Sequence, residues 1–352
     1  MRAIDEDKLT EFLHKVVGDW GAVASAPLVV IGDQLGLYRA MADGESATAE
    51  ELSARTGTAE RYVREWLASQ AAGGYLSYDG GDRYHLEPEQ AVALTDESSP
   101  ACVIGGFESF TSAARVIPQL LQAFRDGSGI GWDAHDPGLF SGTARFFRPG
   151  YVANLVRHWL PALDGVTDRL KAGARVADIG CGYGHSTVLM AQAYPQSSFV
   201  GYDAHPESIE VARKTASDAG VNEQVTFEVA TAKDFPATNL DLVTFFDCLH
   251  DMGDPVGALS HTRQALATDA SVMIVEPQAG DSVGDNMNPL GRMFYSVSTL
   301  VCTPASLSQE VGTALGAQAG PARLAGIARD AGFTRFRKAT ETPFNLVLEA
   351  RP

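Results

Sequence analysis

The sequence predicts an α/β protein whose second half forms an open, mostly parallel sheet and whose first part is mostly helical. From residue 171 onward, short apolar strands alternate with helical segments. A glycine-rich turn joins the first of these strands to a helix, as in nucleotide-binding βαβ units. The first 95 residues show the order helix, turn, helix and hairpin, which describes a winged helix.

Length and composition place limits on the protein class. The chain has 352 residues, of which 45% are hydrophobic, enough for about two domains. We expect a winged-helix domain over residues 1–95, a helical linker with substrate-pocket helices over 96–170, and a cofactor-binding domain over 171–352. No uninterrupted apolar stretch matches a membrane span, and the four cysteines lie far apart without a CxxC pair. We therefore expect a cytoplasmic protein without membrane segments or a disulfide framework.

The N-terminal module is read from its start and stop signals. Residues 5–40 carry apolar residues at helical spacing, with a break expected near Pro27. The capping box Thr48–Glu51 opens a short helix, and a second helix follows over 59–72 until two glycines stop it. The hairpin strands are expected at residues 75–77 and 83–86.

Charge separates the two usual roles of a winged helix, DNA binding and dimerisation. Residues 1–95 contain eight Lys/Arg against sixteen Asp/Glu, a net charge of −8 within a chain of net charge −17. On the second helix, Glu60 and Glu65 offset Arg61 and Arg64, which leaves no face that attracts phosphates. We therefore expect a homodimer and no DNA binding. The first long helix supplies apolar surface for it: Trp20, Leu28, Val29, Val30, Ile31 and Leu35.

The linker over 96–170 is rich in aromatic residues and is interrupted by a glycine-rich stretch over 126–142. Its aromatic residues either line a substrate pocket or fill the seam between domains, and the sequence leaves both open. The run Trp132–Asp136 contains a histidine and two acids that could hold a metal. Because no matching cluster completes such a site, we expect no metal.

The glycine-rich turn is the centre of the second half. A buried strand, Arg175–Ile179, carries Asp178 near its end, and a second strand over 198–202 is followed by Asp203. The turn between the first strand and its helix reads Gly180, Cys181, Gly182, Tyr183 and Gly184. Glycines permit a tight turn and close approach of a ligand, and an acid after the second strand can accept two ribose hydroxyls. The alternative is that these glycines serve packing alone.

Strands and helices continue to alternate after the second strand. Further strands are expected at 225–229, 240–246 and 271–275, with a helix over 255–267, and the tail forms two strands over 333–340 and 344–350. The connection over 278–320 is far longer than a usual one and contains methionine and aromatic residues. This connection either forms a lid over an apolar substrate or has the purely structural role of covering the domain.

In these acids and glycines the chain resembles the class I S-adenosylmethionine-dependent methyltransferases. The resemblance implies a seven-stranded, Rossmann-like methyltransferase sheet with a C-terminal β-hairpin, and S-adenosylmethionine as cofactor. It also implies that the glycine turn passes the methionine part and that Asp203 holds the ribose. Thr231 stands where the family usually has an acid for the adenine. The cofactor-binding residues expected are Asp178, Gly180, Cys181, Gly182, Gly184, Asp203, Ala204, Thr231, Ala232, Lys233 and Asp247.

The catalytic candidates follow the fourth and fifth strands. Leu249–Asp254 resembles the LHDW-type motif of plant and bacterial O-methyltransferases, which implies that His250 is a general base and that Glu276 orients it. Asp251 is a further candidate for orienting the ring. A second acid of the family motif is missing near residues 320–323, where Arg323 stands instead.

The expected function is methyl transfer to a small, aromatic molecule that bears a hydroxyl group. Carbon or nitrogen methylation of a small metabolite is the alternative within the enzyme class. The chain also resembles bacterial winged-helix methyltransferases that are often labelled as regulators, so a cofactor-sensing transcriptional regulator is the alternative outside it.

Overall fold

A computed structural model describes residues 3–352, which divide into two compact units. Unit 1 comprises the chain up to Thr111 together with Ser141–Pro149, and unit 2 comprises Ser112–Phe140 and Gly150–Pro352. The linker expected over 96–170 is thus shared between the two units. Residue 1, the expected start of the first domain, lies outside the described residues.

Unit 1 contains the helices and hairpin of a winged helix. Its elements are α1 (Glu6–Gln34), η1 (Arg39–Met41), α2 (Ala49–Thr56), α3 (Glu60–Ala72), β1 (Ser77–Gly80), β2 (Arg83–His85), α4 (Pro88–Thr95) and most of α5 (Ile104–Ala113). The capping box forms as expected: the Glu51 amide donates to the Thr48 hydroxyl at 3.2 Å, and the Thr48 amide donates to the Glu51 carboxylate at 2.8 Å. Gly57 ends α2 with a φ of 66°. The helices and the hairpin pack around one apolar core that includes Trp66 and Leu67.

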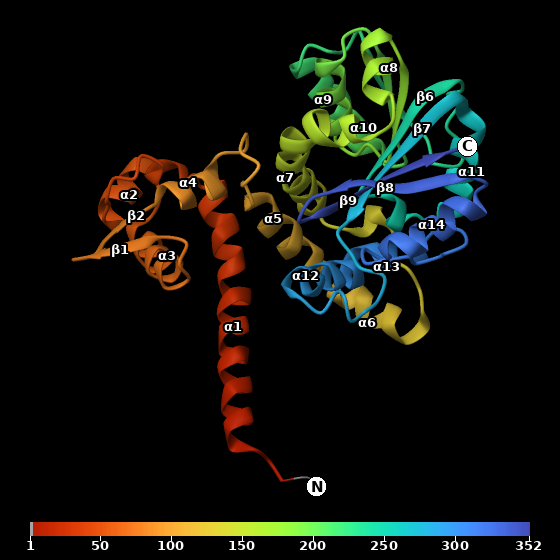
Figure 1. Cartoon of the computed structure of the whole chain (residues 1–352). Coiled ribbons are helices and arrows are strands. Elements are labelled where there is room, and N and C mark those ends of the chain that lie inside the picture. Colours follow the sequence, from red (N-terminus) through yellow and green to blue (C-terminus); the bar gives the residue numbers. More distant parts are fainter. Residues whose placement is uncertain (1–2) are drawn as a thin grey trace. The chain divides into compact units, whose positions relative to one another are not determined.

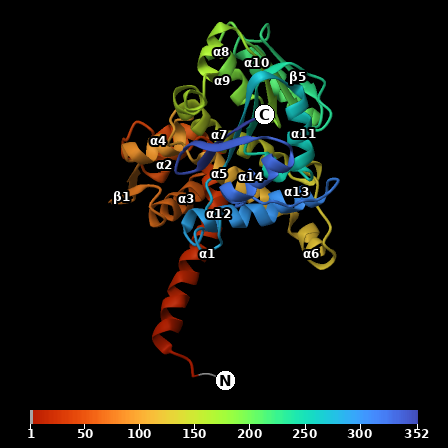
Figure 2. The same cartoon turned by 45° about the vertical axis from the view of Figure 1, so that its right-hand side comes forward.

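Helix α1 continues through Pro27 without the expected break and ends at Gln34, before the end of the expected segment at residue 40. The missing amide of Pro27 frees the carbonyl of Val23, a residue that is 74% exposed, so water can satisfy it. Figures 1 and 2 show that the N-terminal part of α1 projects beyond α2, α3 and α4. By length and composition alone, this helix would also be able to cross a membrane, although it contains no uninterrupted apolar run of that length.

A largely buried arginine ties part of helix α7 (Pro137–Asn154) into unit 1. The Arg145 guanidinium donates to Asp33 at 2.7 Å, to Glu97 at 2.7 Å and to Glu108 at 2.9 Å. These three carboxylates come from α1, from the α4–α5 connection and from α5. One cation from α7 therefore holds three separate segments of the N-terminal unit together.

Unit 2 contains a seven-stranded sheet within the described part of the chain, in the order β5-β4-β3-β6-β7-β9-β8 (Figure 1). Its strands are β3 (Arg175–Ile179), β4 (Ser198–Asp203), β5 (Val225–Val229), β6 (Leu240–Phe246), β7 (Leu266–Pro277), β8 (Arg335–Glu341) and β9 (Asn345–Arg351). Strands β3 to β7 pair in parallel, whereas β9 runs antiparallel to both β7 and β8. The predicted methyltransferase-type sheet with its C-terminal hairpin is confirmed.

In unit 2 the predicted strand bounds agree with the structure to within two residues except for β7, whereas β1 of unit 1 spans Ser77–Gly80 and not the expected 75–77. Strand β7 begins at Leu266, five residues before the expected start at Ser271, and α11 (Pro255–Ala265) ends correspondingly earlier. Asp269 has a φ of 64°, and the pairing of β6 with β7 shifts register near Leu240. This irregularity lets the chain pair with β6 before the apolar run begins, a pairing that hydrophobic pattern alone does not signal.

Helices cover both faces of the sheet. Helices α9 (His185–Ala193) and α10 (Pro206–Asp218) connect β3, β4 and β5, while α11 connects β6 and β7 in the opposite direction. Because parallel crossovers are right-handed, the two groups lie on opposite faces, and α14 (Gly320–Asp330) packs beside α11 (Figure 1). The carboxyl ends of β3, β4, β6 and β7 consequently open at one edge.

The connection over 278–320 contains three consecutive helical elements over residues 289–307. It contains α12 (Pro289–Val297), the π-helical turn η7 (Ser298–Cys302) and α13 (Thr303–Leu307), which both views place at the end of unit 2 where α14 lies (Figures 1 and 2). The remaining helical elements of the unit are η2 (Ala114–Val116), α6 (Ile117–Asp126), η3 (Trp132–Ala134), η4 (Leu155–Trp159), η5 (Leu160–Ala162), α8 (Val166–Ala172) and η6 (Leu249–Asp251).

Candidate functional site

The glycine turn after β3 has the left-handed backbone that its glycines permit. Gly180, Gly182 and Gly184 have φ values of 69°, 52° and 77°. A Cβ at Gly184 would lie 2.5 Å from the Phe227 ring, and one at Gly180 would lie 2.8 Å from Cys248 Sγ. Nothing lies within 4 Å of the corresponding position at Gly182. Two of the glycines therefore allow close packing, and the middle one leaves open space where a ligand can approach the backbone.

Asp203 connects the glycine turn to the end of β4. Its carboxylate accepts the Gly182 amide on Oδ2 and the His205 amide on Oδ1, both at 2.9 Å. Burial raises the pKa of Asp203, although the two amides oppose that shift. Each carboxylate oxygen has a further lone pair beyond these bonds. Ala204, the next residue, is exposed, and Cys181 is buried in the turn.

Asp178 is engaged inside the protein. Ser186 and Thr187 donate to its Oδ2 at 2.7 and 2.6 Å, and Thr244 donates to its Oδ1 at 3.0 Å. The side chain is 1% exposed, and burial raises its pKa to about 6 in spite of the three hydroxyls. These bonds tie β3 to the start of α9 and to β6. The carboxylate thus supports the glycine turn from inside the protein, through its bonds to the helix that follows the turn.

Asp247 and the loop after β5 complete the expected cofactor positions. Asp247 has a φ of 51° and accepts the Asn345 amide on Oδ1 at 2.8 Å. Burial, and next the charge of Glu276, raise the pKa of Asp247 well above its usual value. After β5, the backbone amide and hydroxyl of Thr231 both donate to Asp234 at 2.7 Å. Three further contacts belong to this region: Tyr151 to Asp247, Lys233 to Asp254 and Lys233 to Glu310.

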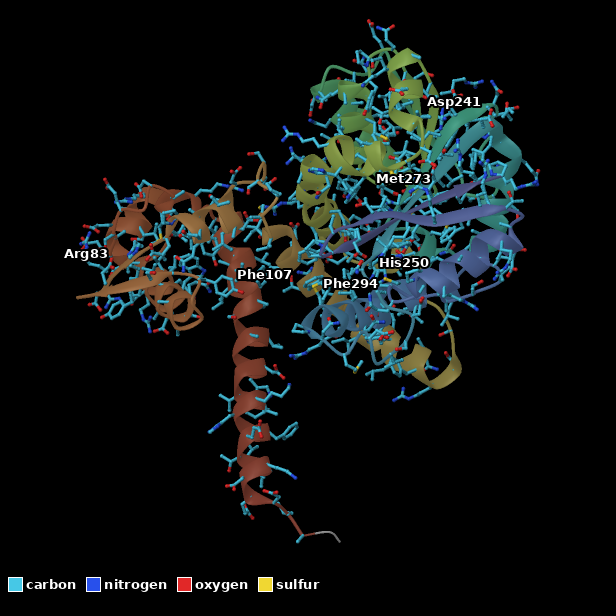
Figure 3. All side chains as sticks on the ribbon, in the orientation of Figure 1. Arg83, Phe107, Asp241, His250, Met273 and Phe294 are labelled. Carbon is cyan, nitrogen blue, oxygen red and sulfur yellow. The ribbon has the colours of Figure 1, made fainter. Side chains whose placement is uncertain are left out.

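The structure brings all three catalytic candidates together. His250 lies in η6, directly after β6, and is 3% exposed (Figure 3). Its Nδ1 hydrogen-bonds to Glu276 Oε2, and its backbone amide donates to Glu276 Oε1 at 3.3 Å. The pairing fixes the orientation of the ring and directs Nε2 away from Glu276. On that side, Nε2 lies 3.1 Å from Oδ1 of Asp251.

The charge around the histidine bears on what it can do. Burial by itself would lower the pKa of His250, but Glu276 and then Asp251 outweigh burial and raise that pKa well above its usual value. Both acids thus favour the protonated ring, whereas a general base must be neutral when it accepts a proton. Asp251 orients the ring from the side on which a substrate proton would have to arrive.

Sequence reasoning missed several residues of this region. Cys302, from the long connection, lies beside His250 and Asp251, because their ligating atoms are all within 4.8 Å of one another. Asn345 and Tyr151 reach Asp247 from 98 and 96 residues away. Only the adjacent hydroxyls of Ser186 and Thr187, in the first turn of α9, had a local signal in the sequence.

The buried histidine of the Trp132–Asp136 run is placed differently from these residues. His135 is 6% exposed, and neither ring nitrogen has a hydrogen-bond partner among residues 3–352. Burial lowers the pKa of His135, which keeps the ring neutral. The residue is not part of the close group formed by His250, Asp251 and Cys302.

Comparison with known proteins identifies two parts of the chain. Residues 170–324 match the family described as "Methyltransferase domain", and residues 23–96 match the "Rv2258c-like winged HTH domain". The ubiquinone biosynthesis O-methyltransferase of Xanthomonas euvesicatoria pv. vesicatoria is 33% identical over 184 residues, which cover 51% of this chain and 60% of the relative. The 27-O-demethylrifamycin SV methyltransferase of Amycolatopsis mediterranei is 35% identical over 149 residues, 38% of this chain and 54% of the relative.

Two solved structures resemble almost the whole chain. One is a putative O-methyltransferase from Nostoc punctiforme PCC 73102, with a TM-score of 0.73, 20% identity and coverage of 97% of this chain and 98% of the other. The other is human N-acetylserotonin methyltransferase in complex with SAM, with a TM-score of 0.73, 18% identity and coverage of 100% and 99%. At this identity the likeness concerns the fold. The curated relatives above are spanned only in part, to 60% and 54% of their lengths.

The raised pKa of Asp178 makes a prediction about stability. A carboxyl whose pKa rises from 3.8 to about 6 on folding binds its proton more tightly in the folded state. Its contribution to the free energy of unfolding therefore falls as pH rises from about 4 to about 6, by on the order of 3 kcal/mol. Urea unfolding of the parent and of Asp178→Asn between pH 4 and 7 measures this contribution. Over this range the free energy of unfolding of the parent should fall relative to that of the variant by about 3 kcal/mol. A difference that stays constant with pH would contradict it.

Proposed function

Because the chain joins a winged helix-turn-helix domain to a methyltransferase domain of the class I fold, we propose that it transfers the methyl group of S-adenosylmethionine to a small molecule bearing a hydroxyl group. The observation that carries this proposal is the convergence of the glycine turn, Asp203 and the His250–Glu276 pair at one edge of the sheet. The donor side and the acceptor side of a methyl transfer would then lie at adjacent strand ends.

The open position at Gly182 and the carboxylate of Asp203 would bind the methyl donor. S-adenosylmethionine carries ribose hydroxyls, which donate to a carboxylate, and a sulfonium cation, which favours an acidic surrounding. Asp203, Asp178 and Asp247 are all acids at the relevant strand ends. The Asp203 carboxylate already fixes the glycine turn through Gly182, so the ribose would bind a preorganised group.

His250 would act on the methyl acceptor. A hydroxyl must lose its proton as its oxygen attacks the sulfonium methyl, and the proton would pass to Nε2 of His250 while Glu276 holds Nδ1. For this role the acceptor has to take the place of the Asp251 carboxylate beside Nε2. An aromatic acceptor suits the apolar residues of the long connection, among them Phe294 in α12. Carbon or nitrogen methylation remains the competing chemistry, in which His250 positions an acceptor that is already nucleophilic.

The winged helix is proposed to pair two copies of the chain. In α3, Arg61 lies 2.7 Å from Glu65, and Arg64 pairs with Glu60, so both arginines are engaged by carboxylates. The exposed face of α1 is instead apolar. Its exposed large hydrophobic residues are Leu9, Phe12, Leu13, Val17, Trp20, Val23 and Ile31, and Ile4 and Leu35 lie just beyond its two ends. An acidic module with one long apolar helix face fits a protein partner better than DNA.

For the cofactor, we expect Asp203→Ala to weaken binding of S-adenosylmethionine by about 1–3 kcal/mol, because charge-assisted hydrogen bonds to the ribose are lost. Isothermal titration calorimetry with S-adenosylmethionine and S-adenosylhomocysteine measures this. Asp218→Ala, which removes an exposed carboxylate that pairs with Lys214, should bind like the parent. Absence of binding by the parent, or preference for NADH, would overturn the proposed function.

For the acceptor, we expect His250→Ala to lower kcat about 10²- to 10⁴-fold while leaving cofactor affinity nearly unchanged. A screen of phenols, catechols, amines and 2-keto acids with detection of S-adenosylhomocysteine identifies the substrate on which this is measured. His158→Ala, at an exposed position, is the matched control. Turnover confined to carbon or nitrogen acceptors, or a phenol methylated at the parent rate by His250→Ala, would refute the base.

For the assembly, we expect a dimer in light scattering at micromolar concentration and a monomer of 37.4 kDa for the double variant Val17→Glu/Trp20→Glu. Both side chains are more than 60% exposed in the isolated chain, so burial against a second copy would explain them. Ala22→Glu, at an exposed position on the opposite side of α1, should remain dimeric. A monomeric parent, or specific and salt-sensitive retention of genomic DNA fragments in a gel shift, would contradict this assignment.

A further inference from the structure

A histidine outside the proposed catalytic group is buried with both of its ring nitrogens unpaired. His135 follows the helical turn η3 and is 6% exposed, and neither nitrogen has a hydrogen-bond partner among the residues that the structure describes. A neutral imidazole carries one donor and one acceptor, so burying both without partners is costly. A phenylalanine would fill similar space without that cost. The two nitrogens therefore indicate a polar ligand at this position.

The segment that leads to His135 packs on η7 and α13 of the long connection. The Ile130 amide donates to the Pro304 carbonyl at 2.9 Å, and Trp132 packs in one apolar cluster with the buried Val301. The rings of Trp132 and His135 have their centroids 5.9 Å apart. The histidine is thus held beside the two helical elements of the connection that also reach the acceptor side.

The same two helical elements contact Asp251, the neighbour of the proposed base. The Cys302 thiol at the end of η7 lies within 4.8 Å of a carboxylate oxygen of Asp251, and the Gln309 side chain, just after α13, donates to the Asp251 carbonyl at 2.9 Å. Burial lowers the pKa of His135, and of the charges that oppose this shift Asp251 acts more strongly than Asp133, which is only two residues away in the chain. The His135 ring therefore lies toward the acceptor side.

The residues after His135 extend from there to the donor side. The Phe140 ring lies 5.6 Å from that of Trp132 and stacks on His205, with the ring centroids 4.4 Å apart. The His205 amide donates to Asp203, which is the proposed ribose ligand. One short aromatic segment of unit 2 thus contacts residues of both sides of the proposed methyl transfer, and His135 is its unpaired polar group.

We propose that His135 binds the methyl acceptor through a second oxygen substituent, a hydroxyl or a carbonyl, on the same aromatic molecule. A neutral imidazole donates to either kind of oxygen and also accepts from a hydroxyl. This inference rests on the proposed function and leaves His250 as the proton acceptor. His250 would contact the hydroxyl that is methylated, while His135 would hold the other oxygen and so fix the orientation of the ring between them.

Binding in the presence of S-adenosylhomocysteine tests this role on the full chain without requiring turnover. Catechol, resorcinol and hydroquinone each add one hydroxyl to phenol, and the dihydroxynaphthalenes do the same for 2-naphthol. We expect the parent to bind at least one diol about 10-fold more tightly than the matching mono-ol in calorimetry, because one further hydrogen bond forms. His135→Phe should lose this preference and bind the mono-ol nearly as before. His135→Gln, which keeps a donor and an acceptor, should retain part of it.

Stability gives a second measurement with a matched control. His135→Phe removes two unpaired buried polar atoms, so the unliganded variant should resist urea at least as well as the parent. His261 differs in having a partner, because its Nε2 lies 2.9 Å from the Phe235 carbonyl. His261→Phe should therefore lower the stability and keep the preference for diols. A His135→Phe protein that is clearly less stable than the parent would show a purely structural histidine and would contradict the proposal.

The binding outcomes also distinguish this inference from the proposed function. A preference for a diol that His135→Phe abolishes supports the subsite even if no acceptor is methylated, a result that would count against the proposed function alone. A parent without any preference, whether it binds all of the probes or none, would overturn the subsite. A folded His135→Phe protein that keeps the preference, or that loses affinity equally for diols and mono-ols, would overturn it as well.

Discussion

The parallel pairing of β3 with β4 on one side and β6 on the other is the constraint on which the site depends. Residue for residue, Ile179 lies opposite Tyr202 and Phe245, so the chain leaves all three strands at the same level. Asp203 and Asp247, which are far apart in the sequence, therefore reach the sheet edge beside the glycine turn. A slip of one residue in either pairing would turn the side chains of the strand to the opposite face. Asp178 helps to specify this register, because its carboxylate accepts the hydroxyls of Thr244 on β6 and of Ser186 and Thr187 on α9.

The acids at this edge are held by neutral donors, with amides on Asp203 and hydroxyls on Asp178. Such bonds position a carboxylate without neutralising it, unlike an arginine pair. The protein uses the other solution in unit 1, where one guanidinium serves three carboxylates. The contrast is informative, because a carboxylate that is paired with a cation has its charge compensated, whereas one held by neutral donors keeps its charge.

The sequence predicted the strands of the sheet, apart from the early start of β7, and it predicted that Asp203, Asp247 and His250 lie at or just after strand ends. Alternation of apolar strands and helices is a local signal, and parallel topology then places His250 and Glu276 together without further information. The sequence did not predict that Cys302 and Asn345 lie near these residues. Cys302 belongs to the long connection and Asn345 to the C-terminal hairpin. Their positions depend on packing between segments that share no local pattern. The continuous helix through Pro27 was also missed, because solvent satisfied a carbonyl that the rule assumes to be buried.

The route of α7 through both units has a consequence for how the protein can be divided. Arg145 lies well beyond the hairpin and helices of the winged helix, yet its guanidinium pairs with Asp33, Glu97 and Glu108. Because Arg39 also contacts Asp33 and Glu97, a fragment that stopped near residue 111 would mainly leave Glu108 without the arginine that pairs with it. It would also lose the segment that packs beside α5. The two units are thus interleaved, not serial. The N-terminal unit is therefore complete only after the first segment of unit 2 has been synthesised, and a single crossover cannot exchange either unit as a whole.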